Sequence, residues 1–128
     1  MIKEFLSWIK LKVTLDDKIG RPTINNREIW WCSLGCNVGE EANGKNNQFS
    51  RPVLILKKLT KHSFVGLPLT SKDKVGDWYV PVTIGEKVSN VMLHQVRVLD
   101  SKRLTTMMVR LDNKDFKEVQ QAFIKFYS

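Results

Sequence analysis

An arginine and a threonine stand at the ends of two predicted strands, and their side chains could act together on a phosphate group. Arg51 precedes the apolar run Pro52–Leu59, and Thr70 closes the run Ser63–Thr70. If these strands are antiparallel neighbours, both residues lie at the same end of the sheet. The planar donors of a guanidinium match a phosphate, and the threonine hydroxyl adds a donor for the charge that develops in phosphoryl transfer. The alternative is an exposed arginine before a proline and an ordinary threonine at the end of a strand.

Other catalytic signatures are absent from the sequence. It contains no GxSxG, P-loop, HExxH or Rossmann glycine motif. Cys32 and Cys36 are four positions apart, and His62 and His94 are distant from them, so a zinc ligand set is not indicated. We therefore expect neither a metal nor any other cofactor, and we interpret both cysteines as reduced thiols.

The chain is strongly basic. Its 128 residues include 21 lysines and arginines against 13 acidic residues, which gives a net charge of +8 at pH 7. A small domain of this charge suits a polyanion such as a nucleic acid, although a merely soluble basic protein would have the same composition. Lysines interrupt the apolar runs near the N-terminus, and no apolar stretch approaches the length of a membrane span. We expect a single cytoplasmic domain over residues 1–128, without membrane contact.

Short β-like segments dominate the middle of the chain, and a helix follows them. The predicted strands are Glu28–Leu34, Pro52–Leu59, Ser63–Thr70, Asp77–Ile84, Asn90–Leu99 and Thr105–Leu111. Pro68 indicates an edge strand or a bend. Apolar residues then recur at helical spacing after Asp112 or Asn113, either of which can cap a helix. This order favours a mainly β (α+β) fold, a small, partly open barrel with helices packed outside.

An additional amphipathic helix is predicted over residues 2–16, within an N-terminal extension of residues 1–20. Its apolar positions are Ile2, Phe5, Leu6, Ile9 and Val13. Their spacing of three, four and seven places them on one helical face. We expect this face to pack on the domain and to cover one edge of the barrel, and contact with a partner is the alternative.

Four sequence blocks then occur in the order and spacing of a known family, over residues 27–125. The blocks are Glu28–Trp31 with Leu34 and Val38–Glu41, Arg51–Ile55, Pro68–Ser71, and Gln95–Arg97 with Leu99-Asp100 and Lys102–Leu104. This pattern resembles the MazF/PemK endoribonuclease toxins of type II toxin–antitoxin systems. The extension before residue 27 lies outside this resemblance.

The resemblance implies an SH3-like barrel that forms a homodimer and cleaves single-stranded RNA, such as mRNA, without a metal. In such enzymes the ribose 2′-hydroxyl attacks the neighbouring phosphate, which leaves a 2′,3′-cyclic phosphate and a 5′-hydroxyl. The implied protein partner is an acidic antitoxin that folds along a basic groove. The alternative function is a catalytically weak or inactive barrel that binds RNA or protein.

The resemblance also assigns roles to individual residues. It places Arg51 and Thr70 in catalysis. The RNA-binding residues that we predict on this basis are Glu41, Lys45, Ser71, Gln95 and Arg97. His94 occupies a position that is often acidic in the family, and a histidine there could act as base or acid near neutral pH. An ordinary histidine on the barrel surface is the other interpretation of His94.

The segment between the first two strands, residues 35–50, is rich in glycine and asparagine and ends directly at Arg51. We expect a long loop whose position controls the access of RNA to the phosphate site. Glu40 and Glu41 would repel RNA if they were held over the groove, whereas Lys45 would follow the RNA strand. An insertion without a role is the alternative.

Overall fold

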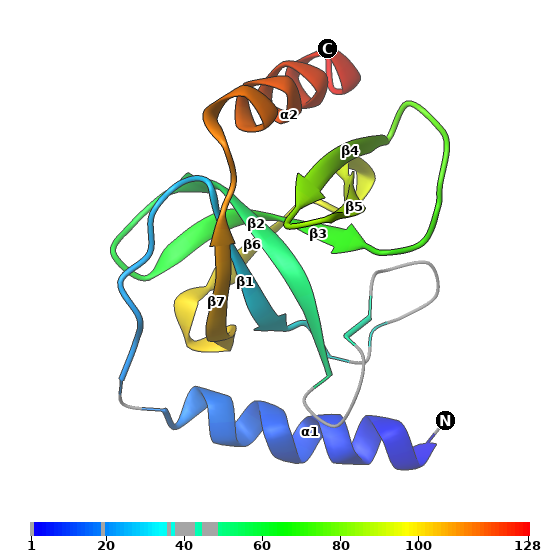
Figure 1. Ribbon diagram of the computed structural model, residues 1–128. Coiled ribbons are helices and arrows are strands. Elements are labelled where there is room, and N and C mark those ends of the chain that lie inside the picture. The colour runs from blue at the N-terminus through cyan, green and yellow to red at the C-terminus, as the bar shows by residue number, and fades with distance from the viewer. Residues whose placement is uncertain (1, 19, 36, 38–42, 45–48) are drawn as a thin grey trace.

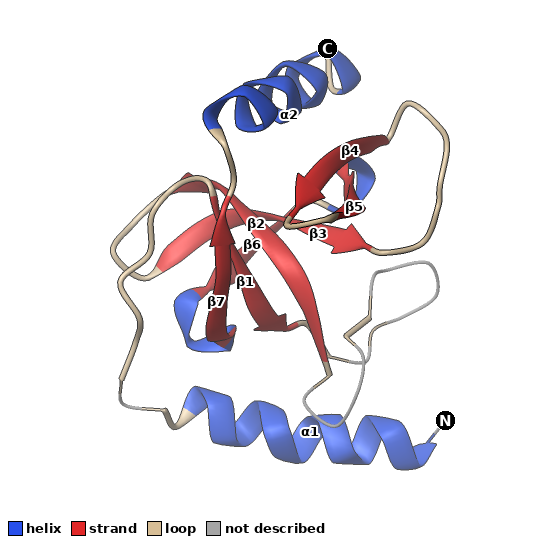
Figure 2. Ribbon diagram, in the orientation of Figure 1, coloured by secondary structure: helices blue, strands red, loops and turns tan. Residues whose placement is uncertain are grey.

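Seven antiparallel strands form one curled sheet, and a helix lies on either side of it in the computed structural model (Figure 1, Figure 2). The structure describes residues 2–18, 20–35, 37, 43–44 and 49–128. The elements in chain order are α1 (Ile2–Asp16), β1 (Glu28–Ser33), β2 (Ser50–Lys58), β3 (Ser63–Thr70), β4 (Tyr79–Ile84), β5 (Lys87–Met92), the 3₁₀ turn η1 (Leu93–Gln95), β6 (Arg97–Asp100), the 3₁₀ turn η2 (Ser101–Arg103), β7 (Leu104–Arg110) and α2 (Asn113–Phe126). The predicted mainly β fold with an N-terminal and a C-terminal helix is confirmed.

The central strand of the sheet is β3. The strand order is β4-β5-β3-β2-β1-β7, and β6 also pairs with β3. One edge of β3 pairs with β2. Along its other edge, residues 63–66 pair with β6 and residues 69–70 pair with β5. Pro68 lies between these two segments, where the ladder changes partner and a missing N–H is tolerated. The edge strand that we considered for Pro68 is therefore wrong. Within the described residues β4 and β7 do not pair with each other, so the barrel is partly open.

The single strand predicted over Asn90–Leu99 is wrong, because two strands and a turn occupy this segment. β5 pairs with one half of β3 and β6 with the other half, so the chain must change direction between them. The turn η1 makes this change. Its buried Leu93 donates its N–H to the carbonyl of Trp78 at 2.7 Å. The sequence pattern hid the turn because apolar residues continue through it.

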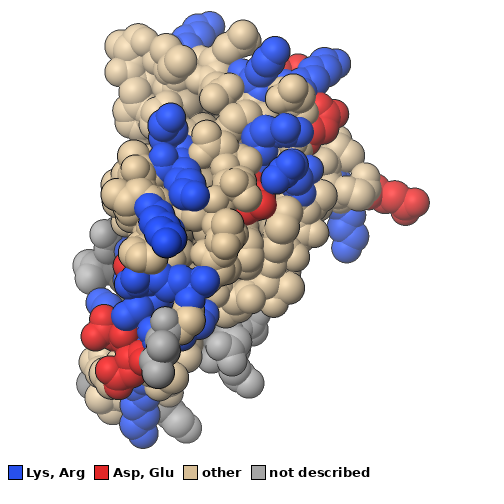
Figure 3. Space-filling model, turned by 90° about the vertical axis from the view of Figure 1, so that its left-hand side faces the viewer, with Lys and Arg blue, Asp and Glu red and all other residues tan. Residues whose placement is uncertain are grey.

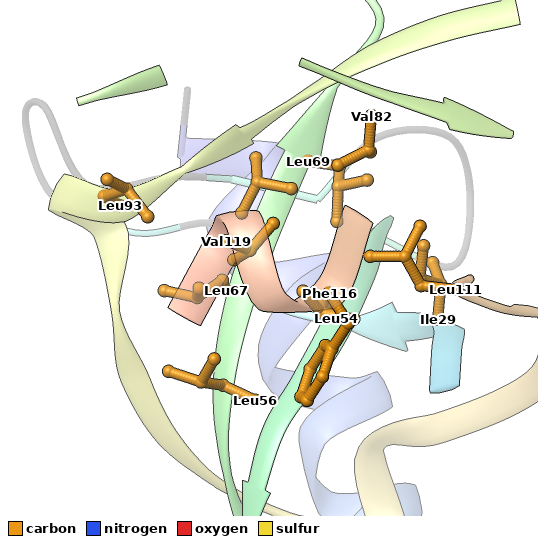
Figure 4. Close-up of a cluster of buried hydrophobic side chains, with 11 residues drawn as sticks. Ile29, Leu54, Leu56, Leu67, Leu69, Val82, Leu93, Leu111, Phe116 and Val119 are labelled. Atoms are coloured by element: carbon orange, nitrogen blue, oxygen red, sulfur yellow. The ribbon is translucent and has the colours of Figure 1, made fainter. Parts of the chain in front are cut away.

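α2 packs on one face of the sheet and closes the first core (Figure 1, Figure 4). The Asp112 side chain accepts a hydrogen bond from the N–H of Lys114, which confirms the predicted cap. The buried residues of this core are Ile29, Leu54, Leu56, Leu67, Leu69, Val82, Val91, Leu93, Leu111, Phe116 and Val119. Since each fully buried aliphatic or phenylalanine side chain contributes about 1.5–3 kcal/mol, this cluster anchors both the sheet and α2.

Alternate residues of β1 and β2 fill a second core. Its members are Ile24, Trp30, Cys32, Leu34, Val53, Ile55, Phe64, Leu99 and Leu104. Cys32 is a free thiol here, and burial raises its pKa to about 12, so it stays protonated at neutral pH. Cys36 lies outside the described residues.

α1 has the predicted bounds but not the predicted packing. Leu6, Ile9 and Val13 are each more than half exposed, whereas Trp8 is 6% exposed. The Trp8 ring lies against Gly35. The centroids of the Trp8 and Phe49 rings are 5.7 Å apart, and the guanidinium carbon of Arg103 lies 5.7 Å from the centroid of the Trp8 ring.

The expected covering of a barrel edge by the apolar face of α1 is therefore wrong. Trp8 anchors the helix next to η2 and the base of the long loop. At the other end, Lys102 Nζ donates to the carbonyl oxygen of Asp16 at 2.6 Å, and Lys18 Nζ donates to that of Leu104 at 3.1 Å. None of the described helices is long and apolar enough to cross a membrane.

Replacing Trp8 with alanine should release α1 from the barrel. Removing a buried tryptophan leaves its surroundings without packing partners, and we expect a loss of about 3 kcal/mol in the free energy of unfolding together with fast amide exchange along α1. Leu6→Ala is the matched control, because Leu6 is 56% exposed, and it should change stability by less than about 0.5 kcal/mol. Hydrogen exchange and thermal unfolding measure both effects. Unchanged protection of α1 in Trp8→Ala would show that another contact holds the helix.

Candidate active site

Arg51 lies at the start of β2, between β1 and β3. Its Cα pairs with that of Cys32 in β1. Its Nη1 donates to the carbonyl oxygen of Leu69 at 3.1 Å, and its Nε donates to that of Asn43 at 2.9 Å. Within the described residues these bonds occupy two of the five guanidinium N–H donors, so the fork is fixed while donors remain for a phosphate. Burial lowers the pKa of Arg51 from its usual value.

Thr70 ends β3 beside Arg51. The β2–β3 register pairs Val53 with Pro68, and continuing it by two residues places Arg51 opposite Thr70 on one face of the sheet. The Thr70 hydroxyl accepts a hydrogen bond from the N–H of Lys72 at 3.3 Å, and its own hydrogen can still donate. The predicted juxtaposition of Arg51 and Thr70 is confirmed.

On its other side Thr70 pairs with Asn90 of β5. The buried Asn90 amide donates to the carbonyl oxygen of Lys72 at 3.0 Å. This bond holds the backbone that follows Thr70, so Asn90 positions the turn on which the hydroxyl depends. No local sequence pattern indicates Asn90, because its importance comes from a pairing of strands that are distant in sequence.

A pocket of about 260 Å³ opens at this end of the sheet. Its lining residues are Trp31, Ser50, Arg51, Pro52, Leu69, Thr70, Ser71 and Ser89. This lining, within the described part of the chain, combines one cation with four hydroxyl groups and no carboxylate, a donor-rich set that suits an anion. A larger pocket of about 430 Å³ lies between α1 and η2 and includes none of the predicted catalytic residues.

His94 lies on η1 and does not line the Arg51 pocket. Its ring contacts two aromatic side chains, with centroid separations of 5.8 Å to Trp78 and 5.5 Å to Tyr79. The structure therefore separates this predicted catalytic residue from the pair of Arg51 and Thr70.

The predicted RNA-binding residues lie in several places. Ser71 is exposed and lines the pocket. Gln95 lies on η1 and is partly buried. Arg97 lies on β6 and pairs with Gly66 of β3. Burial lowers the pKa of Arg103, and the positive charge of neighbouring Arg97 lowers it further. The predicted contacts Glu41 and Lys45 lie outside the described residues, as does most of the loop that we expected to control access.

Comparison with known proteins places this geometry in a family. The family model described as PemK-like, MazF-like toxin of type II toxin–antitoxin system matches residues 25–127. The comparison with curated proteins gave no match.

Solved structures share the fold. MazF from Deinococcus radiodurans in form I is similar with a TM-score of 0.64 and 19% identity, over 85% of this chain and 98% of that chain. The MazE–MazF structure from the same organism in form II gives a TM-score of 0.59 and 16% identity, over 86% and 98% of the two chains. An endoribonuclease in complex with its cognate antitoxin from a mycobacterial species gives 0.59 and 13%, over 81% and 92%. Since the family model spans the segment from just before β1 through α2, the chain belongs to the PemK-like, MazF-like toxins of type II toxin–antitoxin systems.

Proposed function

We propose that this chain is a toxin endoribonuclease that cleaves single-stranded RNA without a metal ion. The observation that carries the proposal is the placement of Arg51 opposite Thr70 at the mouth of a pocket whose described lining has no carboxylate. Membership in the toxin family and the similarity of the fold to a solved endoribonuclease support the same activity.

In the proposed reaction the RNA supplies its own nucleophile. The 2′-oxygen forms a bond to the adjacent phosphorus while the bond from phosphorus to the 5′-oxygen breaks. The 2′-hydroxyl loses a proton and the leaving 5′-oxygen gains one, so the products are a 2′,3′-cyclic phosphate and a 5′-hydroxyl.

Arg51 would hold the phosphate oxygens and stabilise the charge that develops on them. The carbonyl oxygens of Leu69 and Asn43 orient its guanidinium before RNA arrives, so little reorganisation is needed during the reaction. The partial burial that lowers the pKa of Arg51 also strengthens its electrostatic interaction with a phosphate. Thr70 would donate its hydroxyl hydrogen to a second phosphate oxygen.

His94 is a candidate for proton transfer only if the RNA carries the reacting atoms toward η1, because its ring packs on Trp78 and Tyr79. A barrel that binds RNA or protein without cleaving it is the second candidate function, and the experiments below separate the two.

We propose an acidic antitoxin as the protein partner. Two structural neighbours are described as complexes with an antitoxin or with MazE. Among the charged side chains on the face of this molecule that carries β7 and η2, lysine and arginine predominate over aspartate and glutamate (Figure 3). The pocket between α1 and η2 is lined by four cations, two carboxylates and three apolar side chains: Lys12, Arg21, Lys102, Arg103, Asp16, Asp100, Ile9, Val13 and Leu15. Asp100 pairs with Arg21 at 3.4 Å, and the excess of positive charge beside apolar side chains matches an acidic, amphipathic segment.

Cleavage should persist in excess EDTA. If Arg51 and Thr70 supply the electrostatic stabilisation, removing divalent cations should leave the rate of RNA cleavage unchanged. Purified protein incubated with a long unstructured RNA in EDTA should give products that end in a 2′,3′-cyclic phosphate and a 5′-hydroxyl, as shown by end-group analysis. Activity that disappears in EDTA and returns with magnesium would contradict metal independence, and 5′-phosphate ends would contradict the 2′-hydroxyl attack.

Arg51→Lys should slow cleavage by about 10²–10³-fold, because lysine keeps the charge but loses the planar fork. Thr70→Val should slow it by about 10-fold through the loss of one hydrogen bond. Arg110→Lys is the matched control, since Arg110 is an exposed arginine on β7 away from the pocket, and its rate should equal that of the parent. Rates of RNA cleavage by folded variants measure these effects. Equal rates in the parent and all three variants would exclude Arg51 and Thr70 as the catalytic pair, whereas a parent that binds RNA without cleaving it would favour the binding-module alternative.

We also propose a homodimer. Large apolar side chains remain exposed on three strands, at Val88, Val98 and Met107, with exposed fractions of 60%, 67% and 40%. Burial of such side chains drives association of subunits. Light scattering at micromolar concentration should give the mass of two chains, and a mass of 14.8 kDa throughout this range would refute the dimer.

A further inference from the structure

We propose that Trp78, Tyr79 and His94 form a platform on which bases of single-stranded RNA stack, next to the phosphate held by Arg51 and Thr70. This inference rests on the proposed function and assigns a ligand to side chains that the pocket does not include.

The three rings form one cluster. The ring centroids are 6.1 Å apart for Trp78 and Tyr79, 5.8 Å for Trp78 and His94, and 5.5 Å for Tyr79 and His94. Trp78 is nevertheless 44% exposed, and His94 is exposed as well. An aromatic cluster that served only to pack the barrel would be buried, because a tryptophan gains most of its stabilisation by leaving water. The exposed rings therefore offer a surface to a ligand.

The backbone beneath the rings is fixed. The Trp78 carbonyl accepts the N–H of Leu93, which binds the start of β4 to η1. From the opposite side, the Tyr127 hydroxyl of the C-terminal segment donates to the carbonyl oxygen of Leu93 at 2.6 Å. Trp78 also packs against Gly76, where a Cβ would come within 3.4 Å of the indole. The backbone that carries Trp78 and leads into His94 therefore loses little conformational freedom when a base stacks on the rings.

Strand register places Tyr79, the member of the platform that lies in a strand, on the same sheet face as the phosphate site. Thr70 pairs with Asn90, and Tyr79 pairs with Met92, two residues further along β5. Because residues two apart in a strand point to one face, Tyr79 shares its face with Thr70 and, across β3, with Arg51. A step of two residues along the strand and two strands across, from β3 over β5 to β4, corresponds to about 12 Å between the Cα atoms of Thr70 and Tyr79. A short stretch of RNA spans this distance.

The chemistry of the cluster favours nucleobases. Proteins recognise single-stranded RNA by splaying its bases onto aromatic side chains, and stacking accepts every base because each has a π face. In a duplex these faces are covered by stacking on the neighbouring base pairs. The platform should therefore favour single strands over duplexes, and it would hold the bases that flank the reacting phosphate.

Binding of a non-cleavable RNA tests the platform independently of catalysis. The probe is a mixed-sequence, uniformly 2′-O-methylated 12-mer, which has no attacking hydroxyl, presented as a single strand or as a duplex. Trp78→Ala should raise the dissociation constant of the single strand on the order of 10-fold to 100-fold. Trp78→Phe keeps an aromatic ring and should stay within about 3-fold of the parent. Val75→Ala is the matched control, because Val75 lies in the same loop and is 94% exposed, and it should bind as the parent does.

The outcomes separate the platform from the enzyme. Weaker binding in Trp78→Ala with normal binding in Trp78→Phe and Val75→Ala supports the platform, whether or not the parent cleaves RNA. Equal binding by the parent, Trp78→Ala and Tyr79→Ala overturns the platform, while cleavage by the parent would still support the proposed enzyme. A parent that binds neither RNA form overturns the platform and RNA binding together, and the aromatic cluster would then belong to a protein contact.

Discussion

The pairing of β2 with β3 is the interaction on which the rest of this structure depends. Its register sets Arg51 opposite Thr70, and it also sends Leu54 into one core and Val53 into the other. A slip of one residue would exchange the two sets of side chains and move Arg51 away from Thr70. Because apolar burial on both faces opposes such a slip, the geometry of the phosphate site is secured by cores that lie outside it.

The guanidinium of Arg51 needs support of its own, because burial lowers its pKa and removes water from it. The carbonyl oxygen of Leu69 provides part of this support from the sheet, and that of Asn43 provides part from the long loop. The base of this loop is ordered by the Phe49 carbonyl, which accepts the N–H groups of Leu34 and Gly35. Trp8 packs on Phe49, so α1 acts on a segment two residues before Arg51. α1 lies outside the family-matched region, and it thus contacts the segment that leads into Arg51.

Sequence patterns predicted what depends on local spacing. The bounds of α1 and β3, the Asp112 cap and the meeting of Arg51 with Thr70 all follow from periodicity, turn residues and antiparallel neighbours. The predictions failed where partners distant in sequence decide the outcome. The turn η1 exists because β5 and β6 share β3, and Trp8 became the anchor of α1 because Gly35 offers room for an indole ring. Asn90 was missed for the same reason, since only strand pairing brings it beside Thr70.

Catalysis and RNA selection would then depend on different kinds of structure in this barrel. The arrangement of Arg51 and Thr70 follows from backbone register, so any sequence that fills the two cores and retains these residues would keep it. The rings of Trp78 and His94 lie exposed on the sheet margin, where substitutions change neither core. Surface positions of this kind tolerate change at little cost in stability. The fold can therefore preserve one cleavage chemistry while the side chains of the aromatic platform change, and the modest base preferences that stacking strength allows would belong to this margin rather than to the catalytic pair.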